Sequence, residues 1–82
     1  MKKKNFNLRE YNQESIAIYL PVWNSQATIK DALLSLLNQT YKKIIIFILD
    51  NRSSDKTVPI IKNIQKKDNR IKLIIDKKKE ML

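Results

Sequence analysis

An unbroken apolar run, from Ile44 to Leu49, is the feature that most constrains the fold. Isoleucine fills four of its six positions, and no polar residue alternates with them. β-Branched residues favour strands, and a continuous apolar strand is typical of a parallel sheet that is covered on both faces. We therefore predict a strand buried on both faces, with Asp50 at its carboxyl end.

Two further strands are predicted on either side of this run. Residues 15–20 form a short apolar segment, and we expect Pro21 to end it because proline lacks a backbone N–H. Residues 71–75 form a similar segment near the end of the chain.

Two amphipathic helices are predicted between the strands, within residues 24–40 and 53–69. Their apolar residues recur at helical spacing, which predicts one buried stripe on each helix. The stripes consist of Ile29, Ala32, Leu33, Leu36 and Leu37 in the first helix, and of Val58, Ile61 and Ile64 with Ile60 at the edge in the second. Short polar side chains can cap the helix starts, and the candidates are Asn24 or Ser25 and Ser54 or Asp55.

The order strand, helix, strand, helix, strand predicts an α/β fold with a parallel three-stranded sheet and right-handed crossovers. We divide the chain into an arm at residues 1–14, a domain at 15–76 and a basic tail at 77–82. Right-handed crossovers place both helices on one side of the sheet. The second face then has only Phe6, Leu8 and Tyr11 of the arm to cover it, and we expect it to favour self-association.

Composition excludes several kinds of site. The chain has no cysteine and no histidine, so thiolate and imidazole metal ligands are absent. It also has no glycine, which excludes the glycine-rich phosphate loops. No segment is long and apolar enough for a membrane span or a signal peptide, so a cytoplasmic location is expected, with the inner face of the membrane as one possibility.

A net charge of +9 from 17 basic and eight acidic residues favours anionic partners. Most of the lysines are scattered, which is typical of a solvated surface, and we expect no nucleic-acid partner. The alternative is a small basic protein that binds nucleic acid or an anionic surface without an enzymatic role.

Polar residues follow the first two predicted strands, where a parallel sheet binds its ligands. Trp23 offers a flat surface for a nucleotide base, and Asp50 can accept a hydrogen bond from a base N–H or a ribose hydroxyl. In the alternative, Asp50 accepts backbone N–H groups within the turn and Trp23 packs against the end of the sheet.

Several motifs in register resemble the amino-terminal part of the family 2 glycosyltransferases, over about sixty residues. The family pattern runs from Pro-Val-Tyr-Asn through Leu-Asn-Gln-Thr-Tyr to Val-Asp-Asp-Gly-Ser-Thr-Asp-x-Thr, and later to Asp-x-Arg-Ile. The matching residues are Pro21, Val22, Asn24, Leu37, Asn38, Gln39, Thr40, Tyr41, Asp50, Ser53, Asp55, Thr57, Asp68, Arg70 and Ile71.

The resemblance implies the Rossmann-like nucleotide-diphospho-sugar transferase fold and a nucleotide-sugar donor, with uridine diphosphate the expected nucleotide. It implies a nucleotide-binding set of Pro21, Trp23, Asn24, Asp50 and Asn51. It also places Arg70 near the same loops. Two positions depart from the family pattern, because Asn51 replaces the second acid and Arg52 replaces a glycine, which is expected to loosen the turn.

The resemblance further implies that full-length relatives use Mg²⁺ or Mn²⁺, held by an Asp-x-Asp motif. No such motif occurs in this chain, so we expect it to bind no cofactor and to contribute no catalytic residue. We therefore expect a truncated transferase that binds the donor nucleotide and has no activity alone. Full-length relatives would transfer a sugar during glycan or polysaccharide synthesis.

Overall fold

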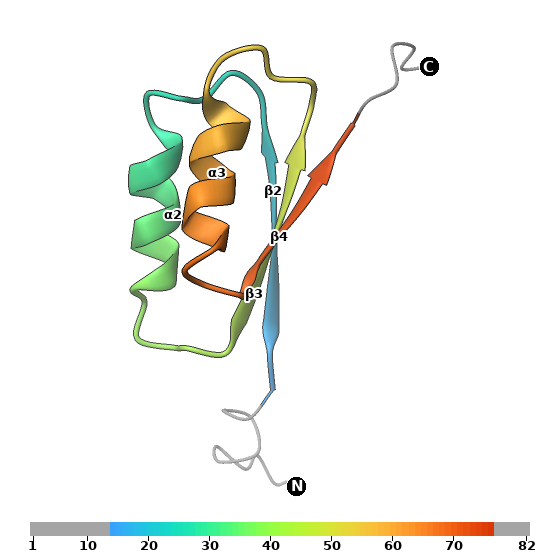
Figure 1. Cartoon of the computed structure of the whole chain (residues 1–82). Coiled ribbons are helices and arrows are strands. Elements are labelled where there is room, and N and C mark those ends of the chain that lie inside the picture. Colours follow the sequence, from blue (N-terminus) through green and yellow to red (C-terminus); the bar gives the residue numbers. More distant parts are fainter. Residues whose placement is uncertain (1–13, 77–82) are drawn as a thin grey trace, which may run out of the picture.

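The computed structural model describes residues 14–76, and residues 1–13 and 77–82 lie outside this range. Three strands and two helices alternate along the chain: β2 (Ile16–Val22), α2 (Ile29–Leu37), β3 (Ile44–Asp50), α3 (Thr57–Gln65) and β4 (Ile71–Ile75). The strands form one parallel sheet in the order β2-β3-β4, with both helices packed on the same face (Figure 1). The predicted fold class is confirmed.

The register brings the carboxyl ends of all three strands to one level. Val22 pairs with Asp50, and Asp50 pairs with Ile75. We call this level the carboxyl edge of the sheet, and the opposite level, where β3 and β4 begin, the amino edge. The loops that follow β2 and β3 therefore meet at the carboxyl edge.

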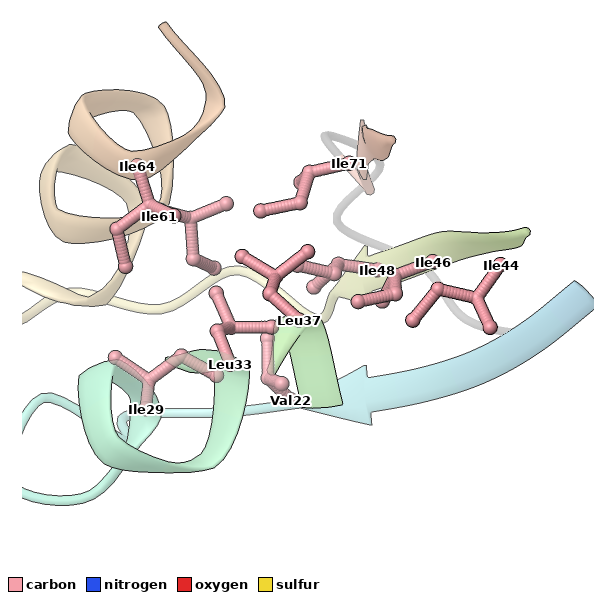
Figure 2. Packing of buried hydrophobic residues seen from close by; sticks show 10 residues of the cluster. All are labelled: Val22, Ile29, Leu33, Leu37, Ile44, Ile46, Ile48, Ile61, Ile64 and Ile71. Atoms are coloured by element: carbon pink, nitrogen blue, oxygen red, sulfur yellow. The ribbon is translucent and has the colours of Figure 1, made fainter. Parts of the chain in front are cut away.

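The core lies between the sheet and the two helices (Figure 2). Alternate residues of β3, namely Ile44, Ile46 and Ile48, are buried against the helices, while Leu49 is 44% exposed. The other buried apolar residues are Val22, Ile29, Leu33, Leu37, Ile61, Ile64 and Ile71. The predicted helix stripes are confirmed in outline, although Ala32 is exposed and Leu36, Val58 and Ile60 are half-buried.

The second face of the sheet is largely uncovered by residues 14–76, as predicted from the placement of both helices on one side. The burial of β3 on both faces, predicted from its apolar run alone, is not found within this range. Strand alternation assigns to this open face the residues Ala17, Tyr19, Pro21, Ile45, Phe47, Leu49, Lys72 and Ile74. The rings of Tyr19 and Phe47 stack there with centroids 5.2 Å apart. Phe6, Leu8 and Tyr11, the residues proposed to cover it, lie outside the described range.

Pro21 does not end the first strand, because β2 continues through it to Val22. β2 is an outermost strand of the sheet, with a neighbour on one side only. A residue without an N–H is tolerated in such a strand if its position faces away from the neighbouring strand.

The helix starts also differ from the prediction. α2 begins after Thr28 and α3 after Lys56, and neither of these flanking residues makes a side-chain capping bond. Of the residues proposed as caps, Asp55 does accept the N–H of Thr57, the first residue of α3, over 2.9 Å. Asn24 and Ser25 bond instead to residues of the second loop and of α3.

Candidate nucleotide site

The candidate site is built on two loops, the first at residues 23–28 and the second at residues 51–56. The Asn51 N–H donates to the Val22 carbonyl over 2.9 Å, so strand pairing continues one residue into the second loop. Trp23 and Asn51 are thus the first loop residues beyond a fixed pair of strands.

Three successive amides of the first loop donate to side chains of the second loop and of α3. Asn24 N–H donates to Ser53 Oγ over 2.8 Å. Ser25 N–H donates to Thr57 Oγ1 over 2.6 Å, and Gln26 N–H donates to Asp55 Oδ2 over 3.2 Å.

The second loop returns the same kind of contact. The amides of Ser54 and Asp55 both donate to Asn24 Oδ1, over 2.8 and 3.3 Å. The amide of Lys56 donates to Gln26 Oε1 over 3.0 Å. We call these reciprocal bonds the interloop network. They satisfy backbone donors in the segments that precede both helices, and Asp55 Oδ1 in addition accepts the N–H of Thr57 at the start of α3.

Asp50 lies under this network. Its side chain is only 1% exposed, and its two oxygens accept Ser53 Oγ–H over 2.5 Å and Ser53 N–H over 3.1 Å. These contacts agree with the alternative given above, in which Asp50 accepts a backbone N–H within the turn and holds the loop. Asn51, which follows it, is exposed.

Asp55 supplies a fixed negative charge to the network. Desolvation acts to raise the pKa of its carboxyl group, but hydrogen bonds from Thr57 and from the Gln26 amide outweigh that effect. The pKa of Asp55 is therefore held below its ordinary value of 3.8.

Both loops contain one residue with a left-handed backbone. Asn24 has φ 42°, and Arg52 has φ 56°. Asparagine adopts this region more readily than most residues, whereas arginine rarely does. The second loop therefore keeps the positive φ that glycine favours, even though arginine occupies the position.

A hollow of about 270 Å³ lies at the carboxyl edge, lined by Pro21, Leu49, Asp50, Asn51 and Asp76. Three of the predicted site residues thus share one hollow, and Trp23, 63% exposed, follows β2 at the same edge. Asp76 was not predicted, although its place directly after the third strand could have indicated it. A larger hollow of about 380 Å³ lies between α2 and α3, lined partly by Arg70, and takes in none of the predicted nucleotide residues.

Arg70 does not lie near the two loops, which corrects the expectation from the resemblance. It precedes β4 at the amino edge, where it pairs with Asp68 over 2.8 Å. The guanidinium also donates to the carbonyls of Lys42, over 2.9 Å, and Leu37, over 3.1 Å. Hydrogen bonding by Arg70 lowers the pKa of Asp68. Arg70 therefore ties the end of α2 to the start of β4.

The divalent metal implied by the resemblance does not fit the residues described. Within 14–76, no group of three or more acidic side chains is placed to hold an ion. No helix in this part of the chain is long and apolar enough to cross a membrane.

A parallel β-α-β-α-β unit is the Rossmann-like arrangement, in which ligands bind beyond the carboxyl ends of the strands. The sequence matches the model of Glycosyl transferase family 2 over residues 17–82, and the chain belongs to that family.

Its relatives are much longer proteins. The chain is 42% identical over 62 residues to an uncharacterized glycosyltransferase of Haemophilus influenzae, covering 76% of this chain and 25% of the relative. It is 34% identical over 61 residues to a GalNAc(5)-diNAcBac-PP-undecaprenol beta-1,3-glucosyltransferase of Campylobacter jejuni, covering 74% and 20%. It is 43% identical over 58 residues to the UDP-Glc:alpha-D-GlcNAc-diphosphoundecaprenol beta-1,3-glucosyltransferase WfaP of Escherichia coli, covering 71% and 22%. The chain thus spans a fifth to a quarter of each of these three proteins.

Proposed function

We propose that this chain forms the donor-nucleotide half-site of a family 2 sugar transferase and binds a uridine diphosphate sugar. The observation that carries the proposal is that the exposed Trp23 lies at the same end of the sheet as Asn51 and a hollow of about 270 Å³. The name of the Escherichia coli relative includes a UDP-sugar donor, which supports uridine as the base.

In this proposal, the indole of Trp23 stacks on the base and the Asn51 amide bonds to the base edge. Pro21 forms part of the wall of the hollow. Asn24 and Asp50 contribute by holding the loops, since their side chains already bond to residues of the second loop. Direct contact between the nucleotide and Asp50 would require the turn to open, because that side chain is buried.

We further propose that nucleotide binding is the part of the reaction that these 82 residues perform. The described residues offer no group of carboxylates for a metal that would assist departure of the diphosphate. An assay with uridine diphosphate sugars should show no metal-dependent turnover by this chain. Metal-dependent hydrolysis or transfer would overturn this part of the proposal.

Calorimetric titration with uridine diphosphate tests the nucleotide site. Base stacking contributes about 1–3 kcal/mol, so Trp23→Ala should weaken binding by about fivefold to about 150-fold. Tyr19→Ala is the matched control, because it removes an exposed aromatic ring from the open face instead. Absence of saturable binding by the wild type, or an unchanged affinity in Trp23→Ala, would contradict the proposal. Tight RNA binding that falls steeply with salt would favour the basic-protein alternative.

We also propose that the open face mediates self-association. Tyr19, Leu49 and Ile74 are 68%, 44% and 51% exposed, and an exposed apolar group of this kind favours contact with another surface. Light scattering should show a mass that rises with concentration and returns to the monomer in Leu49→Lys. A monomer at all concentrations would overturn this assignment.

A location at the inner face of a membrane is proposed on a separate ground. The names of the Campylobacter and Escherichia coli relatives include undecaprenol carriers, which are lipids. Vesicle flotation tests this: the chain should float with anionic vesicles, and failure to float at low salt would contradict the proposal.

A further inference from the structure

The two exposed residues assigned to the nucleotide site stand next to the two left-handed residues of the described chain. Trp23 immediately precedes Asn24, at φ 42°, and Asn51 immediately precedes Arg52, at φ 56°. A left-handed backbone is unfavourable for residues other than glycine and persists where surrounding contacts hold it. The contacts that hold Asn24 therefore bear directly on the position of Trp23.

Asn24 is held at both its backbone and its side chain. Its N–H donates to Ser53 Oγ, and its Oδ1 accepts the amides of Ser54 and Asp55. Every one of these partners belongs to the second loop, so Asn24 cannot turn without breaking contacts to the segment that carries Asn51.

Ser53 connects Asn24 to the sheet. Its hydroxyl accepts the Asn24 N–H over 2.8 Å and donates to Asp50 Oδ1 over 2.5 Å. Asp50 is the last residue of the central strand, and its carbonyl accepts the Asp76 N–H over 2.9 Å. A continuous path of hydrogen bonds thus runs from the rigid sheet through Asp50 and Ser53 to the residue after Trp23.

We infer that Asn24 and Ser53 are positioning residues, which fix Trp23 relative to Asn51 before any ligand binds. We call the hydrogen bonds of Asn24 and Ser53 the lock. The inference rests on the proposed function for its consequence in nucleotide binding, but the lock itself is a property of the free protein. The inference predicts that the site is preorganised and that ligand binding requires little ordering of the two loops.

Trp23 is the only tryptophan in the chain, so its fluorescence reports on the lock without any ligand. Asn24→Ala and Ser53→Ala should lower the steady-state anisotropy of Trp23 and increase its quenching by acrylamide. Ser35→Ala, an exposed change on α2, is the control and should leave both signals unchanged. Far-UV circular dichroism on the same samples checks that each variant is folded.

Two further substitutions separate backbone strain from hydrogen bonding. Asn24→Gly permits a positive φ but removes Oδ1, so it should loosen Trp23. Asn24→Asp keeps the acceptor oxygen and tolerates positive φ, so it should retain the wild-type anisotropy and quenching of Trp23. If Asn24→Gly matches the wild type, or if Asn24→Ala changes nothing while folded, the lock does not exist and the inference is wrong.

Titration of the folded variants with uridine diphosphate tests the consequence. If the variants keep the competent arrangement about a tenth of the time, Asn24→Ala and Ser53→Ala should bind about tenfold more weakly, with Asn24→Asp close to the wild type. Unchanged affinity in variants with a loosened Trp23 would overturn the positioning role. A wild type that binds no nucleotide would instead overturn the proposed function, while the fluorescence differences would still show the lock.

Discussion

The two edges of the sheet are held together by different chemistry. At the amino edge, one guanidinium, that of Arg70, joins Asp68, Leu37 and Lys42. At the carboxyl edge, several short polar side chains form hydrogen bonds between the two loops, and most of these bonds join a side chain to a backbone amide. Gln65 Nε2 also donates to the Ile71 carbonyl at the amino edge, and Tyr41 Oη to the Glu14 carbonyl. The comparison teaches that one substitution removes several contacts where a single guanidinium binds three partners, whereas an edge with distributed contacts loses only one or two.

The largest effect is expected at the amino edge. Arg70→Ala removes charge-assisted bonds to a carboxylate and two carbonyls, and should lower the free energy of unfolding by about 2–3 kcal/mol. Arg70→Lys keeps the charge but not the planar fork, so it should recover less than half of that loss. Urea denaturation measures both. A loss below about 0.5 kcal/mol for Arg70→Ala would show that the amino edge does not depend on this residue.

A smaller effect is expected from one substitution at the carboxyl edge. Thr57 is fully buried, accepts the Ser25 amide and donates to Asp55. Thr57→Val preserves its shape but leaves that amide without its partner, and should cost about 1–2 kcal/mol in urea denaturation. Thr40→Val, on an exposed residue, is the control. A larger loss than in Arg70→Ala would invert the comparison.

Acid should weaken both edges, because each contains a carboxylate whose pKa is lowered by folding. The pKa values of Asp55 and Asp68 both lie below their ordinary value of 3.8 in the folded chain. The stability they contribute is therefore complete above pH 3.8 and is lost as pH falls through the folded values. Carboxyl titration by NMR should place both midpoints below 3.8, and a midpoint at or above it would contradict the assigned contacts.

The smallest effect distinguishes charge from neutral hydrogen bonding. Raising salt to about 1 M screens the partly exposed Arg70–Asp68 pair and should reduce the cost of Arg70→Ala by a few tenths of a kcal/mol. The cost of Thr57→Val should change less, because the contact to the Ser25 amide is neutral and only the bond to Asp55 involves a charge. Equal salt dependence in the two variants would remove the chemical distinction between the edges.

The sequence alone predicted the order of elements, and for β4 it predicted both ends. Periodicity succeeded there because apolar spacing reports which residues face the core. For the second face of β3, the unbroken apolar run predicted cover on both sides, whereas the right-handed crossovers predicted an uncovered face. Within residues 14–76 the prediction from the crossovers is confirmed. The prediction that Pro21 ends the first strand was wrong, because a missing N–H interrupts a strand only where a neighbouring strand would accept that N–H.

The geometry of the candidate site was predicted in part, while its binding role stays a prediction. The resemblance identified the two loops, and Pro21, Asp50 and Asn51 do share one hollow. It could not show that Asn24 bonds across to Ser54 or that Asp50 is buried, because those contacts depend on how two loops about thirty residues apart meet in space. The place of Arg70 was wrong for the same reason, because proximity in a motif does not specify which end of a strand a residue precedes.

The interloop network also has a consequence for the order of folding. Its bonds join residues 29 to 32 apart in sequence, so they can form only after β2, α2 and β3 have come together. Closing contacts at that separation carries an entropic cost that local helix formation does not. The interloop network is therefore expected to form after the strands that carry its two loops have paired. A ligand that binds between these loops would bind the folded chain and not the unfolded chain. By mass action it would therefore stabilise the chain against unfolding.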